Sequence, residues 1–144
     1  NWIIDWVGIK IRVFAVNSEN QIFFANYDDY FLVFDGWQII EAIGFLPQKN
    51  VIKIQVNDNN LTYILNKKVL TTDSCKSWSV SIDEKTNFIF HEQICYAEGT
   101  DYNYTNLIFL NDESQIIALK YKIYPDYPPI QLTMNKYAQL DLDR

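Results

Sequence analysis

The sequence contains few of the residues from which catalytic and redox sites are usually built. Its 144 residues include one histidine, two cysteines, four glycines and four prolines. No GxGxxG, P-loop, GxSxG or HExxH motif occurs, which argues against a phosphate-binding loop, a nucleophile elbow and a zinc-protease helix. We therefore expect a protein that is not an enzyme and that uses no cofactor.

Basic residues and long apolar runs are scarce as well. Lys and Arg total 12 against 18 Asp and Glu, giving a formal net charge of -6. Phosphate binding needs a stripe of Lys and Arg, and the sequence has none, so it predicts no nucleic-acid partner. No apolar run approaches the roughly 18 residues that span a bilayer, and the start lacks the pattern of a signal peptide.

Aromatic and β-branched residues are abundant and favour strands. The sequence is 49% hydrophobic and 16% aromatic, a composition typical of an ordered β protein. Alternation is clearest at 8–16, where Ile9, Ile11 and Val13 share one face. Asp35-Gly36 between two apolar runs predicts a hairpin with a type I′ turn. The sequence predicts one all-β domain over residues 1–144, a meander of short antiparallel strands.

The strand pattern becomes less regular in several places. Pro125, Pro128 and Pro129 must interrupt the sheet, because proline cannot donate to a strand ladder, so the strand after them is expected at an edge. Residues 65–78 remain ambiguous, residues 41–46 could form a helical turn, and the polar residues 139–144 are expected to fray. Strands are predicted at 8–16, 21–26, 30–34, 37–43, 51–57, 61–66, 87–96, 104–110, 115–124 and 130–137.

The two cysteines, Cys75 and Cys95, have neither the spacing of a CxxC redox motif nor that of a zinc site. In an oxidising compartment they could form a disulfide. In the other interpretation they are two unpaired thiols, with Cys95 buried on a strand. The sequence leaves both open.

The candidate catalytic and metal-binding residues do not form a site. His91 and Cys95 share a strand face but lie about 13 Å apart along it, too far for a dyad. The acidic pairs at Asp28, Asp83 and Asp112 fall at predicted turns, where carboxylates are solvated. The stretch from Asp58 lacks the spacing and closing Glu of a calcium loop. We predict no catalytic residues and no metal site.

A set of aromatic residues lies at or near predicted turns instead of on a regular core face. Flat rings with a polar tip suit sugar stacking or a protein interface, although such rings also cover the open face of a curved sheet. The candidate contact residues for a ligand or partner are Trp37, Trp78, Tyr102, Tyr104, Tyr124 and Tyr127.

The order of the motifs resembles a known family. In the first half a strand ends in Phe23-Phe24-Ala25-Asn26, a polar step follows, and Asp35-Gly36 precedes a strand closing at Gly44-Phe45. In the second half Cys95 lies on a strand, a long strand starts at Gln115, and Pro128-Pro129 precedes the last strand. This order is similar to the capsule and exopolysaccharide lipoproteins of Gram-negative bacteria, the GfcB/YjbF type. Departures are Phe23 in place of Trp, Glu41 and Ala42 near a usual Thr, and Ser114 in place of Gly.

The resemblance implies a single large curved antiparallel sheet, as a meander, half-barrel or sandwich-like fold. It implies a periplasmic or outer-membrane lipoprotein that assists export or assembly of surface polysaccharide by binding polysaccharide or export-machinery proteins. A lipid anchor upstream of Asn1 would provide its only membrane attachment. The alternative is a lipid or lipoprotein carrier that holds an acyl chain in the concave face of the sheet.

Overall fold

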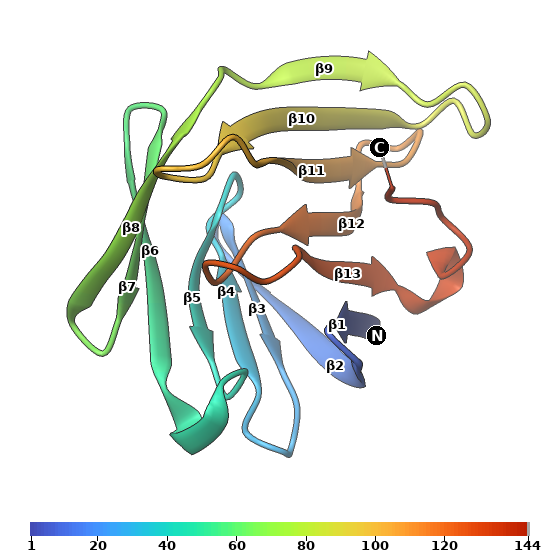
Figure 1. The fold of residues 1–144 in the computed structure, drawn as a ribbon. Helices are drawn as coiled ribbons and strands as arrows, with labels where there is room; N and C mark the ends of the chain where they lie inside the picture. Colours follow the sequence, from blue (N-terminus) through green and yellow to red (C-terminus); the bar gives the residue numbers. More distant parts are fainter. Residues whose placement is uncertain (144) are drawn as a thin grey trace.

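The computed structural model describes residues 1–143, and antiparallel strands account for more than half of them (Figure 1). Two short 3-10 turns, η1 (Pro47–Lys49) and η2 (Asn135–Tyr137), interrupt them. The strands are β1 (Trp2–Trp6), β2 (Ile9–Ser18), β3 (Gln21–Ala25), β4 (Phe31–Phe34), β5 (Ile39–Ile43), β6 (Val51–Asn57), β7 (Asn60–Leu65), β8 (Lys68–Cys75), β9 (Ser79–Ile82), β10 (Ile89–Tyr96), β11 (Asn103–Leu110), β12 (Ile116–Tyr121) and β13 (Ile130–Met134).

The strands close into a barrel, so the predicted single open sheet is wrong. Twelve strands form the ring and β9 is an extra strand beside β10. The ring closes because β10 pairs with β11 along its whole length on one edge, while its other edge pairs with β8 and β9. In Figure 1, β2 to β8 run from top to bottom and β9 to β13 run across them. Alternation fixes which face of a strand is buried, but it does not show which distant strands will meet.

The two ends of the chain meet in the sheet. β1 pairs with β2 on one side and with β13 on the other, with Trp2 opposite Met134. β13 therefore has a neighbour on each side, β12 and β1, and the prediction that it is an edge strand is wrong. The prolines interrupt the sheet before its last strand, β13, as predicted. β1 lies outside the predicted strands, which begin at residue 8.

The predicted Asp35-Gly36 hairpin is present with a different turn. Gly36 has a positive φ of 107°, but Asp35 does not, so the turn is not type I′. Instead the Asp35 carboxylate accepts the backbone N–H groups of Trp37 and Gln38, at 2.8 and 2.7 Å. The ambiguous stretch 65–78 contains β8. Residues 41–43 finish β5 and residues 44–46 form a bend, so no helical turn is present there.

The barrel interior is filled by large side chains. Trp2 packs edge-on against Phe24 at 5.0 Å between ring centroids, and Phe34 packs similarly against Tyr121 at 6.0 Å. Trp6, Ile52, Tyr63 and Leu132 are among the other residues of this cluster.

A second, smaller cluster covers part of the outside of the barrel. The segment after η2 folds back over the outer face of the sheet, where Leu142 is buried with Phe90, Phe109 and Ala118. The Lys120 ammonium also donates to the backbone carbonyl of Leu142 at 3.1 Å. The prediction that residues 139–144 fray is therefore wrong for 139–143; residue 144 lies outside the described residues. Leu140 and Leu142 are the apolar side chains that pack this otherwise polar segment onto the sheet.

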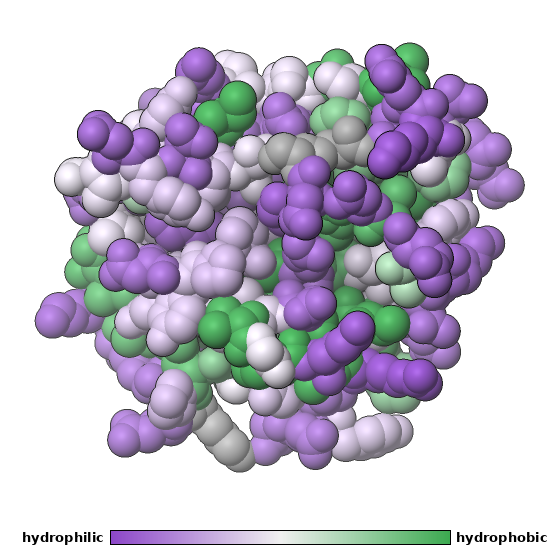
Figure 2. Space-filling model, turned by 45° about the vertical axis from the view of Figure 1, so that its right-hand side comes forward, coloured by the Kyte–Doolittle hydropathy of each residue, from purple (hydrophilic) through white to green (hydrophobic). Residues whose placement is uncertain are grey.

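Elsewhere the surface is mixed. Figure 2 shows hydrophilic residues over most of one face, with apolar residues exposed in smaller patches among them. No helix within residues 1–143 has the length and apolar character to cross a membrane.

Cys75 and Cys95 form a disulfide across twenty residues of chain. They lie directly opposite each other in the ladder between β8 and β10. Of the two interpretations left open by the sequence, the structure has the bonded pair, and both cysteines of the chain are used in it.

Candidate binding site

Two loops of the second half of the chain border a hollow of about 400 Å³. One loop joins β10 to β11 and the other joins β12 to β13; in Figure 1 both are orange loops at the left-hand ends of these strands. The hollow is lined by Ala97, Thr100, Tyr102, Lys122, Asp126, Tyr127 and Pro128. Its wall therefore combines two aromatic rings, a hydroxyl group, a carboxylate and a lysine.

The aromatic rings at the rim are partly exposed and held by neighbouring rings. Tyr102 is 52% exposed and stacks on Tyr104 at 6.2 Å between centroids. Tyr127 is 39% exposed and packs against Tyr124 at 5.6 Å and against Trp6 at 5.3 Å. The Trp6 indole N–H donates to the carbonyl of Pro128 at 2.8 Å, which fixes this loop to the barrel. Rings restrained in this way lose little freedom when a ligand stacks on them.

The floor of the hollow is a buried ion pair. Lys122 Nζ lies 2.6 Å from Asp73 Oδ2, and both side chains are almost completely buried. The Tyr104 hydroxyl donates to the same carboxylate oxygen at 2.6 Å, and the backbone N–H of Glu98 donates to the other oxygen at 3.0 Å. The lysine ammonium also lies 4.6 Å from the centre of the Tyr104 ring. Burial of a charge is tolerated only with such partners, and here both charges have them.

The tyrosines of this floor remain protonated at neutral pH. Burial raises the pKa of Tyr104 far above its ordinary value, and the nearby Tyr63 and Asp73 raise it further. Burial likewise raises the pKa of Tyr63, whose hydroxyl donates to the backbone carbonyl of Lys122 at 3.2 Å. Both groups therefore act as neutral hydrogen-bond donors.

The loop between β10 and β11 is tied to the adjacent strand β8. Besides the Glu98 N–H bond to Asp73, the Glu98 carboxylate accepts the backbone N–H of Thr72 at 3.3 Å. Within the loop, Thr100 Oγ1 donates to the carbonyl of Ala97 and accepts the N–H of Tyr102, both at 3.1 Å. The loop thus holds Tyr102 in place over the hollow.

The charges around the hollow are mainly negative. Glu98 and Asp101 belong to one loop and Asp126 to the other, and all three are exposed. Lys122 is the basic residue of the lining, and its charge is balanced by Asp73. Asp126 is the acidic residue of the lining, so its carboxylate disfavours an anionic ligand, whereas a neutral ligand with hydroxyl groups would find this acceptor and flat rings to stack on.

Four of the six predicted contact residues meet at this hollow. Tyr102 and Tyr127 line it, while Tyr104 and Tyr124 support them. Tyr104 is buried, so it contributes through its hydroxyl and its stacking, not as an exposed contact. Trp37 and Trp78 do not line this hollow. Their ring centroids lie 5.7 Å apart, and the Trp37 ring also contacts the His91 ring, at 5.4 Å between centroids.

Sequence reasoning missed Asp73 and Lys122, the two charges of the floor. Asp73 lies in the stretch that the sequence left ambiguous, and Lys122 was counted only as part of a long strand. A usable signal was present at Asp73, because it alternates with Thr71 and Cys75 on the face of β8 that turns inward. A carboxylate at an inward position requires a buried partner, although the sequence does not identify which one.

The amine of Lys122 and the carboxylate of Asp73 are bound to each other, and the single histidine lies against Trp37. Within residues 1–143 no group of three or more His, Cys, Asp or Glu side chains is placed to hold a metal ion.

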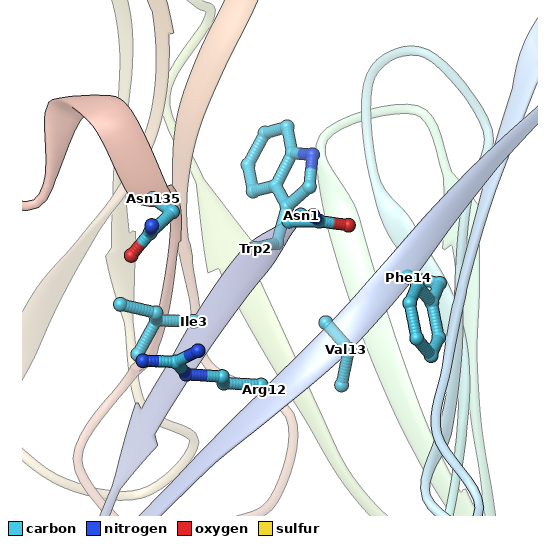
Figure 3. A pocket seen from close by; sticks show the side chains of 7 residues that line it. All are labelled: Asn1, Trp2, Ile3, Arg12, Val13, Phe14 and Asn135. Carbon is cyan, nitrogen blue, oxygen red and sulfur yellow. The ribbon is translucent and has the colours of Figure 1, made fainter.

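A smaller hollow of about 210 Å³ lies beside β1 and β2 (Figure 3). There the Arg12 side chain extends towards Ile3, its partner in the ladder, and Phe14 lies farther along β2. Asn135 borders the same hollow, and its backbone N–H donates to the carbonyl of Asn1 at 2.9 Å. None of the six predicted contact residues lines it, so we do not place the binding site here.

Comparison with known proteins gives one similar fold. The sequence matches no protein-family model and no curated protein. Among solved structures, the hypothetical lipoprotein YmcC from Escherichia coli (K12) is similar, with a TM-score of 0.62 over 92% of this chain and 80% of that chain.

The sequence identity with YmcC is 10%, so the similarity establishes the shared fold. The word lipoprotein in its name describes that protein. A role in capsule or exopolysaccharide export is not part of that protein's name and remains a proposal.

Proposed function

We propose that this protein is an extracytoplasmic, lipoprotein-like binding protein that takes part in export or assembly of surface polysaccharide and binds a neutral glycan in the hollow above Lys122. The observation that carries the proposal is the gathering of Tyr102, Tyr104, Tyr124 and Tyr127 around one hollow. Sugar rings stack on such flat side chains, and the tyrosine hydroxyls and rim carboxylates can exchange hydrogen bonds with sugar hydroxyls.

Further observations support an extracytoplasmic location and a small-ligand site. The fold is that of a hypothetical lipoprotein, and the disulfide between Cys75 and Cys95 is of the kind that persists in an oxidising compartment such as the periplasm. The size of the hollow, about 400 Å³, is in the usual range for a small-ligand site. The carboxylate of Asp126 in the lining favours a neutral sugar unit over a uronic or sialic acid.

Calorimetric titration against neutral and acidic polysaccharide fragments tests the proposal. We expect binding of neutral fragments, and Tyr102→Ala and Tyr127→Ala should each weaken it by about 1 to 3 kcal/mol, as is typical of aromatic anchors. Tyr27→Ala is the matched control, because Tyr27 is an exposed tyrosine outside the hollow. Equal binding by all three variants and the wild type would exclude the hollow as the site, and absence of glycan binding would exclude the function.

We also propose binding without turnover. Chromatography of the glycan after long incubation should recover it at its original length. Shortened or modified fragments would show that the protein is an enzyme. An acyl chain copurified with the protein would instead support a lipid carrier.

A further inference from the structure

The disulfide lies close to the hollow that holds the candidate binding site. Asp73, the carboxylate of the floor, is two residues before Cys75 on β8. Ala97, which begins the loop that carries Tyr102, is two residues after Cys95 at the end of β10. The covalent bond therefore joins the strand that supplies the floor to the strand that leads into the wall of the hollow.

The two strands share few other contacts at this point. Their ladder has two residue pairs, that of the bonded cysteines and that of Ser74 with Tyr96. Beyond the ladder, the N–H of Lys76 donates to the carbonyl of Ile94 at 2.8 Å. On its other edge β10 pairs with β11 along its whole length. A short ladder opens more easily than a long one, because few hydrogen bonds must break together.

Further links between β8 and the loop are hydrogen bonds that belong to the site itself. The N–H of Glu98 donates to the Asp73 carboxylate at 3.0 Å, and the N–H of Thr72 donates to the Glu98 carboxylate at 3.3 Å. Glu98 is exposed, so water competes for these groups and each bond by itself contributes little. They hold the loop over the floor while β8 and β10 stay aligned.

We propose that the disulfide between Cys75 and Cys95 is a positioning element of the glycan site, so that glycan affinity depends on its oxidation state. The proposal rests on the glycan binding proposed above. In the oxidised protein the bond keeps Asp73 under the loop. After reduction the short ladder opens, the Glu98 bonds break, and the ring of Tyr102 loses its fixed place over the hollow.

The reductant is a dithiol. One of its thiolates attacks a sulfur of the protein disulfide and forms a mixed disulfide, which its second thiol then resolves. Two protein thiols and one disulfide of the reductant result, so two electrons and two protons pass to the protein. Disulfides persist in oxidising compartments and are reduced where glutathione and thioredoxin act. The site is therefore complete only where the chain is oxidised.

Calorimetric titration of the oxidised and the dithiothreitol-reduced protein with neutral polysaccharide fragments tests the proposal. The temperature is chosen so that circular dichroism shows both forms folded. We expect reduction to weaken binding by about tenfold or more. Oxidised Leu32→Ala is the control for lost stability, because Leu32 is buried in the barrel core on β4 and does not line the hollow. It should bind like the wild type.

A reciprocal measurement separates positioning of the site from a general effect on stability. If the folded oxidised protein binds glycan tenfold more tightly than the folded reduced protein, saturating glycan must make the disulfide tenfold harder to reduce. For a two-electron couple this is a shift of about 30 mV. Equilibration with dithiothreitol, with and without glycan, measures it.

Equal affinity of the two folded forms would overturn the proposal and leave the proposed function standing. If neither form binds glycan, the proposed function fails, and hydrogen exchange then tests the positioning: the amides of Glu98 and Thr72 should exchange faster after reduction, and unchanged exchange would overturn it. If the reduced protein unfolds, the double variant Cys75→Ala with Cys95→Val, whose apolar side chains partly fill the space of the bond, takes its place in each measurement.

Discussion

Lys122 and Asp73 belong to distant parts of the chain, and each is buried only because the other is present. Their contact distance is 2.6 Å, and Tyr104 also donates to Asp73. A buried ion pair is costly to form but much more costly to break on one side, because the remaining charge then lacks its partner. This asymmetry gives a test of the site that needs no ligand.

We expect Lys122→Met to lower the free energy of unfolding by about 3 to 5 kcal/mol, since it leaves the Asp73 carboxylate buried without its cation. Adding Asp73→Asn should recover part of this loss, because the charge is then removed. Urea unfolding measures both, with Lys85→Met at an exposed lysine as the control. If the double variant is as unstable as the sum of the two single changes, the pair is not coupled as described.

Among the strand pairs of the ring, β8 and β10 share the shortest ladder. Only two residue pairs join these strands, Cys75 with Cys95 and Ser74 with Tyr96. The disulfide lies at this contact, so it ties together two strands whose own ladder is short. β9 continues along the same edge of β10 after the interruption at residues 76–78.

Reduction of the disulfide should therefore lower the free energy of unfolding by about 3 kcal/mol, the loop-entropy value for a closed loop of this size. Urea unfolding with and without a reducing agent measures the difference. Hydrogen exchange should increase first at the ends of β8 and β10. Two free thiols in protein purified from an oxidising compartment would contradict the bond itself, and unchanged stability would contradict its role.

For the whole molecule, closure of the ring makes the two halves of the chain depend on each other. β1 lies between β2 and β13, and most of the buried side chains form a single cluster inside the barrel. We expect a single cooperative unfolding transition, with tryptophan fluorescence and circular dichroism changing together. Separate transitions for the two signals would show that the strands β2 to β8 and β9 to β13 unfold as independent units.

Much of the local structure could be predicted from the sequence. Alternation gave the strand class, most strand positions and the hairpins, because a half-buried strand must place apolar residues at every second position. It failed at β1, at β8 and β9, and in the segment that ends with Leu142. The alternation of apolar and polar residues is weak in these segments, because they are short or mix the two kinds irregularly.

The sequence by itself determined that this protein is an antiparallel β structure with aromatic residues near its loops. Only the tertiary structure decided that the sheet closes, that Tyr102 and Tyr127 share a hollow while Trp37 and Trp78 do not, and that Asp73 meets Lys122. The physical reason is range: alternation and turn chemistry act between neighbouring residues, whereas the pairing of β1 with β13 and of Asp73 with Lys122 joins residues far apart in the chain, and depends on how all the strands pack at once.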